Sequence, residues 1–236
     1  NHAGTESSEA LGAVITVAGI ITISANKLPA VWYNTPSTVF NAQGAVLYHY
    51  SLTANPSDIA AVTDPLFDGS ARSTDVPEGI YYFHVMGRDA GDAVTVGHAH
   101  FGPIYIDGTA PSITAITAQV SAANAAPIPD GGSTSGPTPL FSWTAAASAS
   151  PIVGYSFAVS TDASDIPIQT PNTTLLFREH TFIQSGFYYV KVRALDVAGN
   201  WGPPAGMSLN FTSVPSSSGL PLKKNYFKRL RFPIKS

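Results

Sequence analysis

Apolar and polar residues alternate along much of this chain with a period of two. The clearest run places four residues on one face: Tyr188, Val190, Val192 and Ala194. A similar run earlier in the chain gives the same parity to Tyr81, Phe83, Val85 and Gly87. Turn-forming Gly, Pro, Asn and Asp separate such runs at short intervals, and no window has a convincing helical period. The pattern predicts antiparallel strands that each bury one face.

The strand pattern occurs twice. GIYYFHVMGRD at residues 79–89 corresponds to GFYYVKVRALD at residues 186–196, an offset of 107 residues. Two further segment pairs match in the same order: 50–58 with 155–165, and 37–42 with 138–143. This period is too long for a solenoid repeat, so each copy is expected to have its own core. Several short strands within about a hundred residues are typical of a β-sandwich.

Two motifs resemble fibronectin type III modules. The segment Y-x-V-x-V-x-A at residues 188–194, followed by LDVAGNWGPP, resembles the F strand and F–G turn of such a module. In the first copy, YYFHVMGRDAGD continues to HFGPIYIDGTAP, which is similar to bacterial versions in which an IDxTAP-like segment links two domains. The resemblance covers residues 26–213 and implies the fold; this module serves as spacer, adhesin and enzyme appendage alike.

We therefore predict an all-β chain with two tandem immunoglobulin/fibronectin III-like antiparallel β-sandwiches and extension strands at both termini. The predicted modules span residues 26–110 and 111–214. An N-terminal extension at residues 1–25 precedes them, and a basic tail at residues 215–236 follows.

The N-terminal extension contains an apolar strand at residues 11–24. The residues of its apolar face share one parity: Leu11, Ala13, Ile15, Val17, Gly19, Ile21 and Ile23. This strand either completes its own sandwich or inserts into a neighbouring subunit by β-strand addition. Subunits joined in the second way resemble donor-strand pilins. A helical, pilin-type N-terminus is a third interpretation.

Composition favours an extracellular setting. Charged residues make up 11% of the chain, against about 25% in an average soluble domain. Such a surface suits a wall, stalk or fibre in which self-association is tolerated. The absence of cysteine excludes disulfides and thiolate metal sites. Because the chain begins at Asn1, we expect a secretion signal to have been removed. No apolar stretch reaches the roughly 18 residues of a transmembrane helix.

Charge is divided unevenly along the chain. All fifteen acidic residues precede Pro215, whereas six of the twelve basic residues lie in the tail, so the body carries −9 and the tail +6. Apolar and basic residues alternate in the tail, which predicts a docking strand with an acidic partner surface. Its candidate docking residues are Lys223, Lys224, Tyr226, Lys228, Arg229, Leu230, Arg231 and Phe232. Nucleic acid and anionic membrane are the conventional partners of such a patch; an acidic extracellular body instead favours self-association or an anionic glycan or cell-wall polymer.

Candidate ligand sites are few. His98 and His100 share a strand face, and His84 lies on the expected neighbouring strand, which is a candidate zinc or copper site. Acidic residues near the module boundary are a candidate calcium site: Asp89, Asp92 and Asp107. Asn172 and Asn210 begin formal glycosylation sequons. No cofactor is expected.

Motifs for catalysis are missing from the sequence. It contains no G-x-S-x-G, no H-E-x-x-H and no glycine-rich phosphate loop, and its carboxylates are scattered. We therefore expect a structural protein rather than an enzyme. The expected function is that of an extracellular subunit of a surface filament or layer, joined by N-terminal strand addition and tail docking. The alternative is a monomeric adhesin or carbohydrate-binding stalk module.

Overall fold

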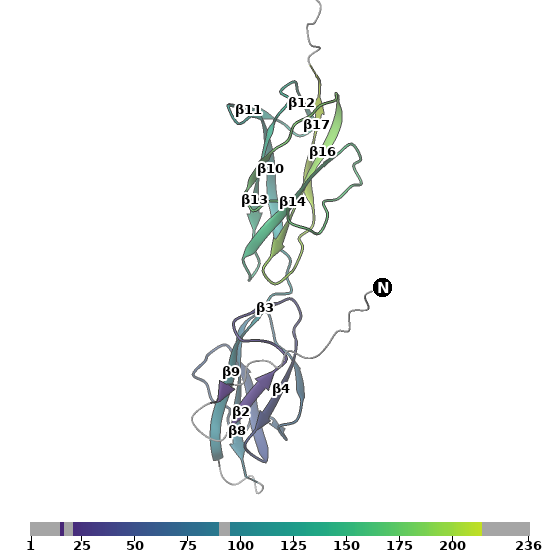
Figure 1. The fold of residues 1–236 in the computed structure, drawn as a ribbon. Coiled ribbons are helices and arrows are strands. Elements are labelled where there is room, and N and C mark those ends of the chain that lie inside the picture. The colour runs from purple at the N-terminus through teal and green to yellow at the C-terminus, as the bar shows by residue number, and fades with distance from the viewer. Residues whose placement is uncertain (1–14, 17–20, 90–94, 214–236) are drawn as a thin grey trace, which may run out of the picture.

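A computed structural model describes residues 15–16, 21–89 and 95–213; for residues 15, 16, 95 and 96 it describes the backbone only. The described residues form strands β1 to β17 without a helix. These strands build two β-sandwiches placed end to end (Figure 1). Within this part of the chain, no helix long and apolar enough to cross a membrane occurs.

The first sandwich contains two sheets. One sheet has the order β1 (Ile15–Thr16), β2 (Thr22–Ala25), β4 (Ser37–Gln43) and β7 (Arg72–Asp75). The other has the order β3 (Trp32–Tyr33), β9 (Thr95–Ile106), β8 (Gly79–Arg88), β5 (Leu47–Thr53) and β6 (Leu66–Phe67).

The second sandwich also contains two sheets. Its first sheet has the order β11 (Asn124–Ile128), β10 (Ser112–Ser121), β13 (Leu140–Ala146) and β15 (Phe177–Glu179). Its second sheet has the order β12 (Gly132–Thr134), β17 (Ala205–Phe211), β16 (Gly186–Asp196) and β14 (Ile152–Ser160).

Strand order defines the fold class. In each sandwich the first strand lies beside the second, and a short following strand crosses to the other sheet. There it pairs in parallel with the last strand, as β3 does with β9 and β12 with β17. The Tyr188 hydroxyl donates to the Gln184 carbonyl at 2.9 Å, which is the tyrosine corner of Greek-key sandwiches. The prediction of two tandem immunoglobulin/fibronectin III-like sandwiches is confirmed.

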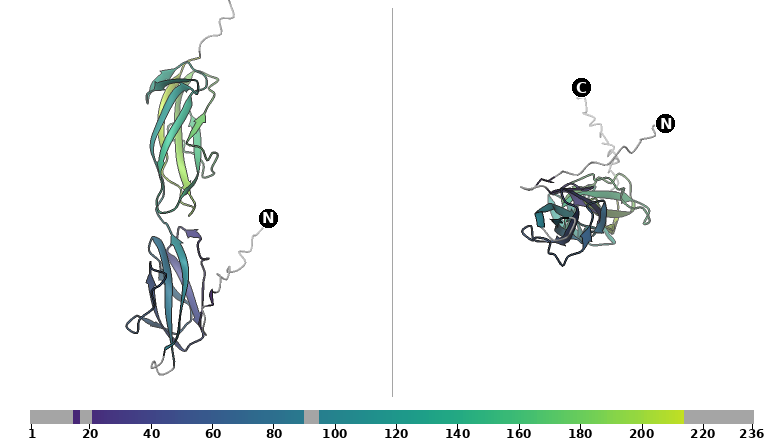
Figure 2. Two further views of the ribbon diagram at one scale, coloured as in Figure 1. Left: turned by 90° about the vertical axis from the view of Figure 1, so that its left-hand side faces the viewer. Right: turned by 90° about the horizontal axis from the view of Figure 1, so that it is seen from below.

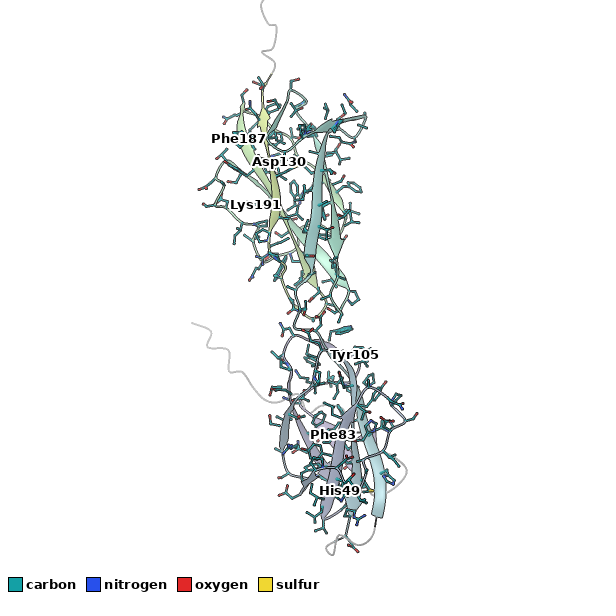
Figure 3. The ribbon with its side chains drawn as sticks, turned by 180° about the vertical axis from the view of Figure 1, so that it is seen from behind. His49, Phe83, Tyr105, Asp130, Phe187 and Lys191 are labelled. Carbon is teal, nitrogen blue, oxygen red and sulfur yellow. The ribbon has the colours of Figure 1, made fainter. Side chains whose placement is uncertain are left out.

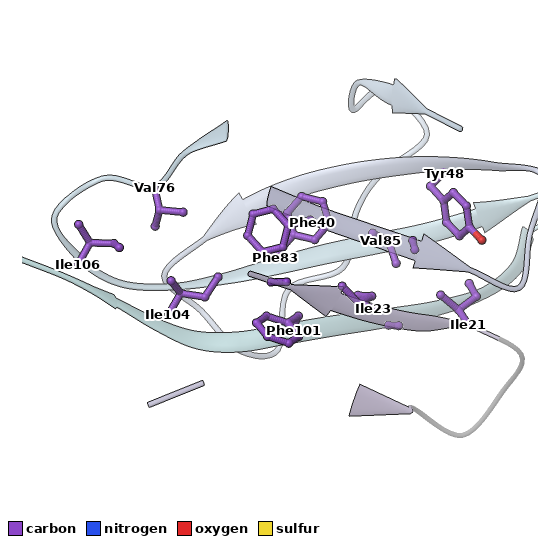
Figure 4. Close-up of a cluster of buried hydrophobic side chains, with 13 residues drawn as sticks. Ile21, Ile23, Phe40, Tyr48, Val76, Phe83, Val85, Phe101, Ile104 and Ile106 are labelled. Carbon is purple, nitrogen blue, oxygen red and sulfur yellow. The ribbon is translucent and has the colours of Figure 1, made fainter. Parts of the chain in front are cut away.

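Each sandwich has its own aromatic core. In the first, Phe40 and Phe83 face each other across the two sheets with ring centroids 3.9 Å apart, and Phe101 packs edge-on against Phe40 (Figure 4). In the second, Trp143 stacks on Phe157 at 5.9 Å. The period of two accounts for both, because alternate residues of every strand point between the sheets.

One stretch of the first sandwich is buried on both faces. The side chains of His84 and Met86 have the outward parity on β8, yet they are only 1% and 5% exposed. The segment between β5 and β6 covers them. His84 Nε2 lies 3.1 Å from the Thr53 hydroxyl, and His49 Nδ1 lies 2.7 Å from the Asp64 carbonyl oxygen. Alternation alone predicted an open face here.

The N-terminal extension differs from the prediction of one strand over residues 11–24. β1 and β2 form an antiparallel pair in which Ile15 is opposite Ile23, so the chain reverses direction between them. β2 also pairs with β4, and both Ile21 and Ile23 are buried in the core of their own sandwich. Residues 21–25 therefore belong to the first module, and Ile21 and Ile23 follow the intramolecular alternative.

Candidate functional site

The junction between the sandwiches is organised around Asp107, directly after β9. Its side chain is fully buried. One carboxylate oxygen accepts hydrogen bonds from the Ser148 hydroxyl and the Ser150 backbone N–H, both at 2.6 Å. The other oxygen accepts from the Thr109 N–H at 3.0 Å. A residue at the end of the first module thereby holds the turn between β13 and β14 of the second.

The pKa of Asp107 results from two opposing effects. Burial acts to raise it, because a desolvated carboxylate is disfavoured. The hydrogen bonds from Ser148, Ser150 and Thr109 together outweigh burial and hold the pKa below its usual value. The group is therefore a carboxylate at neutral pH, and its hydrogen bonds are charge-assisted.

Asn200 supports the junction from the turn between β16 and β17. Its side-chain amide donates to the Asp107 carbonyl oxygen at 2.7 Å and to an Asp196 carboxylate oxygen at 2.9 Å. The other Asp196 oxygen accepts the Asn200 backbone N–H at 2.8 Å, which fixes the turn. The AGNW sequence thus supplies an amide that spans from one module to the linker.

Glu78 holds the linker from the side of the first module. Its carboxylate accepts the Gly108 N–H at 3.0 Å and the Thr109 hydroxyl at 2.9 Å. On the other side, Gly202 lies so close to Pro111 that a Cβ there would be 2.1 Å from the Pro111 carbonyl oxygen. Acceptors from the first module and a close backbone contact with the second thus enclose residues 107–111. Figure 2 shows the sandwiches in line from a second direction.

This arrangement leaves Asp107 no role in the predicted calcium site. Both of its oxygens accept hydrogen bonds from the protein. Asp92 lies outside the described residues, and Asp89 directly follows β8, which ends at Arg88.

The predicted three-histidine metal site does not form. His84 and His100 are cross-strand neighbours with ring centroids 6.0 Å apart, whereas His98 is opposite Met86 and exposed. His98 and His100 are two residues apart on β9, so about 7 Å separates them along the strand. Among the residues that the structure describes, no three His, Cys, Asp or Glu side chains are grouped to hold a metal ion.

The remaining predicted residues have varied placements. The tail residues 223–232 and four of the N-terminal set (Leu11, Ala13, Val17 and Gly19) lie outside the described part of the chain. The Asn172 side-chain nitrogen donates to the Phe157 carbonyl at 2.8 Å, and its side-chain oxygen accepts the Phe157 N–H at 3.0 Å. This sequon side chain is therefore bound to the backbone of β14. Asn210 is exposed on β17.

A second feature lies on the outer face of the second sandwich. Phe187 and Tyr189 form an edge-to-face pair on β16, with ring centroids 5.3 Å apart. Beside them is a hollow of about 270 Å³ lined by Asp130, Tyr189, Lys191, Gly206, Met207 and Ser208. Figure 3 shows Phe187, Asp130 and Lys191 near one another on this module.

Sequence reasoning missed most of these residues. The junction partners Ser148, Ser150 and Asn200 come from loops whose approach depends on the end-to-end arrangement of the modules. The outward parity of Tyr189 and Lys191 on β16 was visible, but Asp130 lies 59 residues earlier in a turn. The AGNW turn beside the IDxTAP-like linker was the one available signal for the junction.

Comparisons with known proteins give low similarity. No family model and no curated protein matches the chain. Fibronectin(III)-like modules of Clostridium thermocellum CbhA share 10% identity with it over 81% of this chain and 94% of that chain, with a TM-score of 0.36. The FN1–FN3 domains of chicken CNTN1 share 16% over 86% and 67%, with a TM-score of 0.35. Dimeric latent PorU from Porphyromonas gingivalis shares 10% over 83% and 24%, with a TM-score of 0.30. By its own strand order, the chain consists of tandem fibronectin III/immunoglobulin-like β-sandwich modules.

Proposed function

We propose that this chain is an extracellular structural or adhesive unit in which two sandwiches form a stiff rod. The observation that carries the proposal is the hydrogen-bonded junction around Asp107 and Asn200. Charge-assisted hydrogen bonds in a buried setting hold the groups that they join rigidly. A stiff pair of modules suits a spacer that keeps its two ends apart.

The placement of the chain ends gives the rod a direction. Ile21 packs next to Gly87, at the end of the first module far from the junction. Ser213 bonds to Ser185 at 2.7 Å, at the far end of the second module. Residues 21 and 213 therefore lie at opposite ends of the rod, while β1 runs back alongside β2 from the first of these ends. Contacts at opposite ends are what a head-to-tail assembly uses. We propose the finer function of a filament or layer subunit, joined through residues 1–20 and the basic tail.

The alternative is a monomeric adhesin or carbohydrate-binding stalk module. The observation that favours it is the outward-facing aromatic pair of Phe187 and Tyr189, since exposed aromatic patches mark interaction surfaces. Both functions place the protein at the cell surface, consistent with its low charge content of 11%.

Truncation separates the two functions. The full chain, a variant lacking residues 1–20 and a variant lacking residues 1–10 are compared by sedimentation velocity over a range of concentrations. Loss of residues 1–20 should abolish association because it removes the apolar segment. Loss of residues 1–10 should preserve it because only a polar stretch is removed. Circular dichroism confirms that each variant stays folded.

Two outcomes would contradict the filament function. One is a full chain that stays monomeric at every concentration, which leaves the adhesive alternative; the other is association that persists without residues 1–20 and without residues 215–236. Association through the tail should weaken as salt rises, since the Debye length falls to about 3 Å at 1 M.

A further inference from the structure

We propose that the outer face of β16 and β17 is a binding site for a neutral glycan chain, with Tyr189 and Phe187 as its stacking platform and Asp130 and Lys191 as its polar contacts. The proposal deepens the adhesive alternative by naming its ligand class and site. It does not depend on how subunits assemble.

The platform consists of three cross-strand rows on one sheet face. Phe187 is opposite Asn210, Tyr189 is opposite Ser208, and Lys191 is opposite Gly206. Together the rows extend about 13 Å along the strand. The platform is apolar at the Phe187 end and polar at the Lys191 end.

The two aromatic rings are presented to solvent rather than to the core. Phe187 is 44% exposed, and it packs against Tyr189 instead of a core residue. A single exposed apolar residue is ordinary. The exposed Phe187 and the half-buried Tyr189 lie beside a hollow with their ring planes 73° apart. The face of one ring offers an apolar surface on which the C–H face of a sugar ring packs, while the Tyr hydroxyl remains a polar contact.

The polar groups of the hollow are fixed in place by the protein. One Asp130 oxygen accepts the Ser208 N–H at 2.7 Å and the Ser208 hydroxyl at 3.0 Å. These bonds hold the pKa of Asp130 below its usual value, so the group is a carboxylate at neutral pH. The Gly131 backbone also acts on this carboxylate and lowers its pKa further. A fixed carboxylate oxygen open to solvent is a strong acceptor for a hydroxyl.

Lys191 is also anchored. Its ammonium group donates to the backbone carbonyls of Ala163 and Asp165, the latter at 2.6 Å. An ammonium has three N–H donors, of which these bonds use two. Gly206 makes room for the lysine stem, because a Cβ there would lie 2.9 Å from Lys191 Cγ. Groups held in place before binding lose little freedom when a ligand arrives.

Charge and size select the ligand class. The residues that line the hollow include one acidic and one basic side chain, Asp130 and Lys191, so their formal charges cancel. Nucleic acid requires a basic surface, and this module has five acidic and three basic residues. A volume of about 270 Å³ is at the lower limit of small-ligand sites, about 300 Å³. The hollow fits one sugar-sized unit, and the rest of the glycan chain would extend over the rings of Phe187 and Tyr189.

The test is affinity electrophoresis of the full chain in gels that contain soluble neutral polysaccharides: a β-glucan, a xyloglucan and a mannan. A gel with polygalacturonate supplies the acidic comparison. We expect retardation in at least one neutral gel. Tyr189→Ala and Phe187→Ala should weaken the interaction about tenfold or more, as truncation of a hot-spot aromatic does. Asp130→Asn should also weaken it while retaining an acceptor for Ser208.

The first module provides the matched control. Tyr82 occupies the position that corresponds to Tyr189, 107 residues earlier, but its ring neighbours are His84 and His100. Tyr82→Ala should leave retardation unchanged. Absence of retardation in every neutral gel overturns the proposal, as does binding to polygalacturonate alone. Retardation unaffected by Tyr189→Ala overturns it too. A change in sedimentation for Phe187→Ala without gel retardation would assign this face to self-association instead.

Discussion

At the scale of single residues, His84 is the most unusual side chain of the first module. It is buried on the outward face of β8, and its Nδ1 has no hydrogen-bond partner among the described residues. Burial, reinforced by the neighbouring His100, lowers the pKa of His84; Asp58 and the Asn55 backbone act in the opposite direction but do not compensate. The folded protein therefore holds His84 in its neutral form.

This predicts loss of stability in mild acid. Above the unfolded-chain pKa of 6.5 the imidazole is neutral in both states. As the pH falls below that value, the unfolded chain takes up a proton that the folded chain refuses, so the free energy of unfolding declines. Thermal unfolding between about pH 8 and pH 5 should show a smaller acid-induced decrease in Tm for His84→Gln than for the wild type.

The exposed His98 is the control position. His98→Gln should reproduce the wild-type pH dependence. His180, whose pKa is also lowered by burial and by Arg178, maintains part of the acid sensitivity in every variant. Equal slopes for wild type and His84→Gln would refute the assignment.

The sequence predicted the inward residues well and the outward ones poorly. Val190 and Val192 are fully buried as their parity required. His84 had the parity of an exposed residue, and its burial depends on the segment between β5 and β6, which alternation along β8 does not encode. The spacing of His84, His98 and His100 suggested a metal site. The cross-strand register places only His100 opposite His84, and alternation does not encode that register.

At the scale of elements, the turn after β16 closes against the linker. Gly202 donates its N–H to the Ala194 carbonyl at 2.8 Å, and its carbonyl accepts Arg193 Nε at 3.1 Å. The contact with the Pro111 backbone leaves no space for a side chain. Arg193 also lies over the Trp201 ring at 5.1 Å, so the turn is fixed from both sides.

We predict that Gly202→Ala destabilises the second module. The added Cβ would lie 2.1 Å from the Pro111 carbonyl oxygen, so either the turn or the linker must move, at a cost of about 1–3 kcal/mol or more. Urea denaturation measures the loss. Gly186→Ala is the matched control, since its Cβ would meet nothing closer than 3.5 Å. Equal midpoints for the two variants would show that the contact is relaxed easily.

Element prediction succeeded where strands are long and failed where they are short. β8 and β16 follow from clear alternation, and the repeat identified them as equivalents. The N-terminal apolar segment has the same alternation throughout, so a single strand was expected. The structure places a reversal between Thr16 and Thr22 instead. Alternation along a run does not encode which strands pair, and here β2 pairs with both β1 and β4.

At the scale of the whole molecule, the proposed stiffness of the rod depends on Asp107. Asp107→Ala would leave the Ser148 hydroxyl and the Ser150 N–H without their acceptor. We expect both cores to remain folded while the angle between modules becomes variable. Small-angle X-ray scattering should then show a broader pair-distance distribution than for the wild type.

Asp162→Ala provides the control for this experiment. Asp162 accepts hydrogen bonds from the Ser164 N–H and hydroxyl within one exposed turn, and it lies away from the junction. Its scattering should match the wild type. A scattering curve for Asp107→Ala that superimposes on the wild-type curve would mean that the Glu78 and Asn200 contacts are sufficient by themselves.

The parallel strand pairs described in both sandwiches have a mechanical consequence. β3 pairs with β9, and β12 with β17, and in each pair one strand leads toward the chain entry and the other toward the exit. Tension along the rod pulls the two strands in opposite directions along their length. The ladder bonds between them are then loaded together in shear instead of opening one after another. Each module is thereby built to transmit a pulling force between whatever is attached at its two ends.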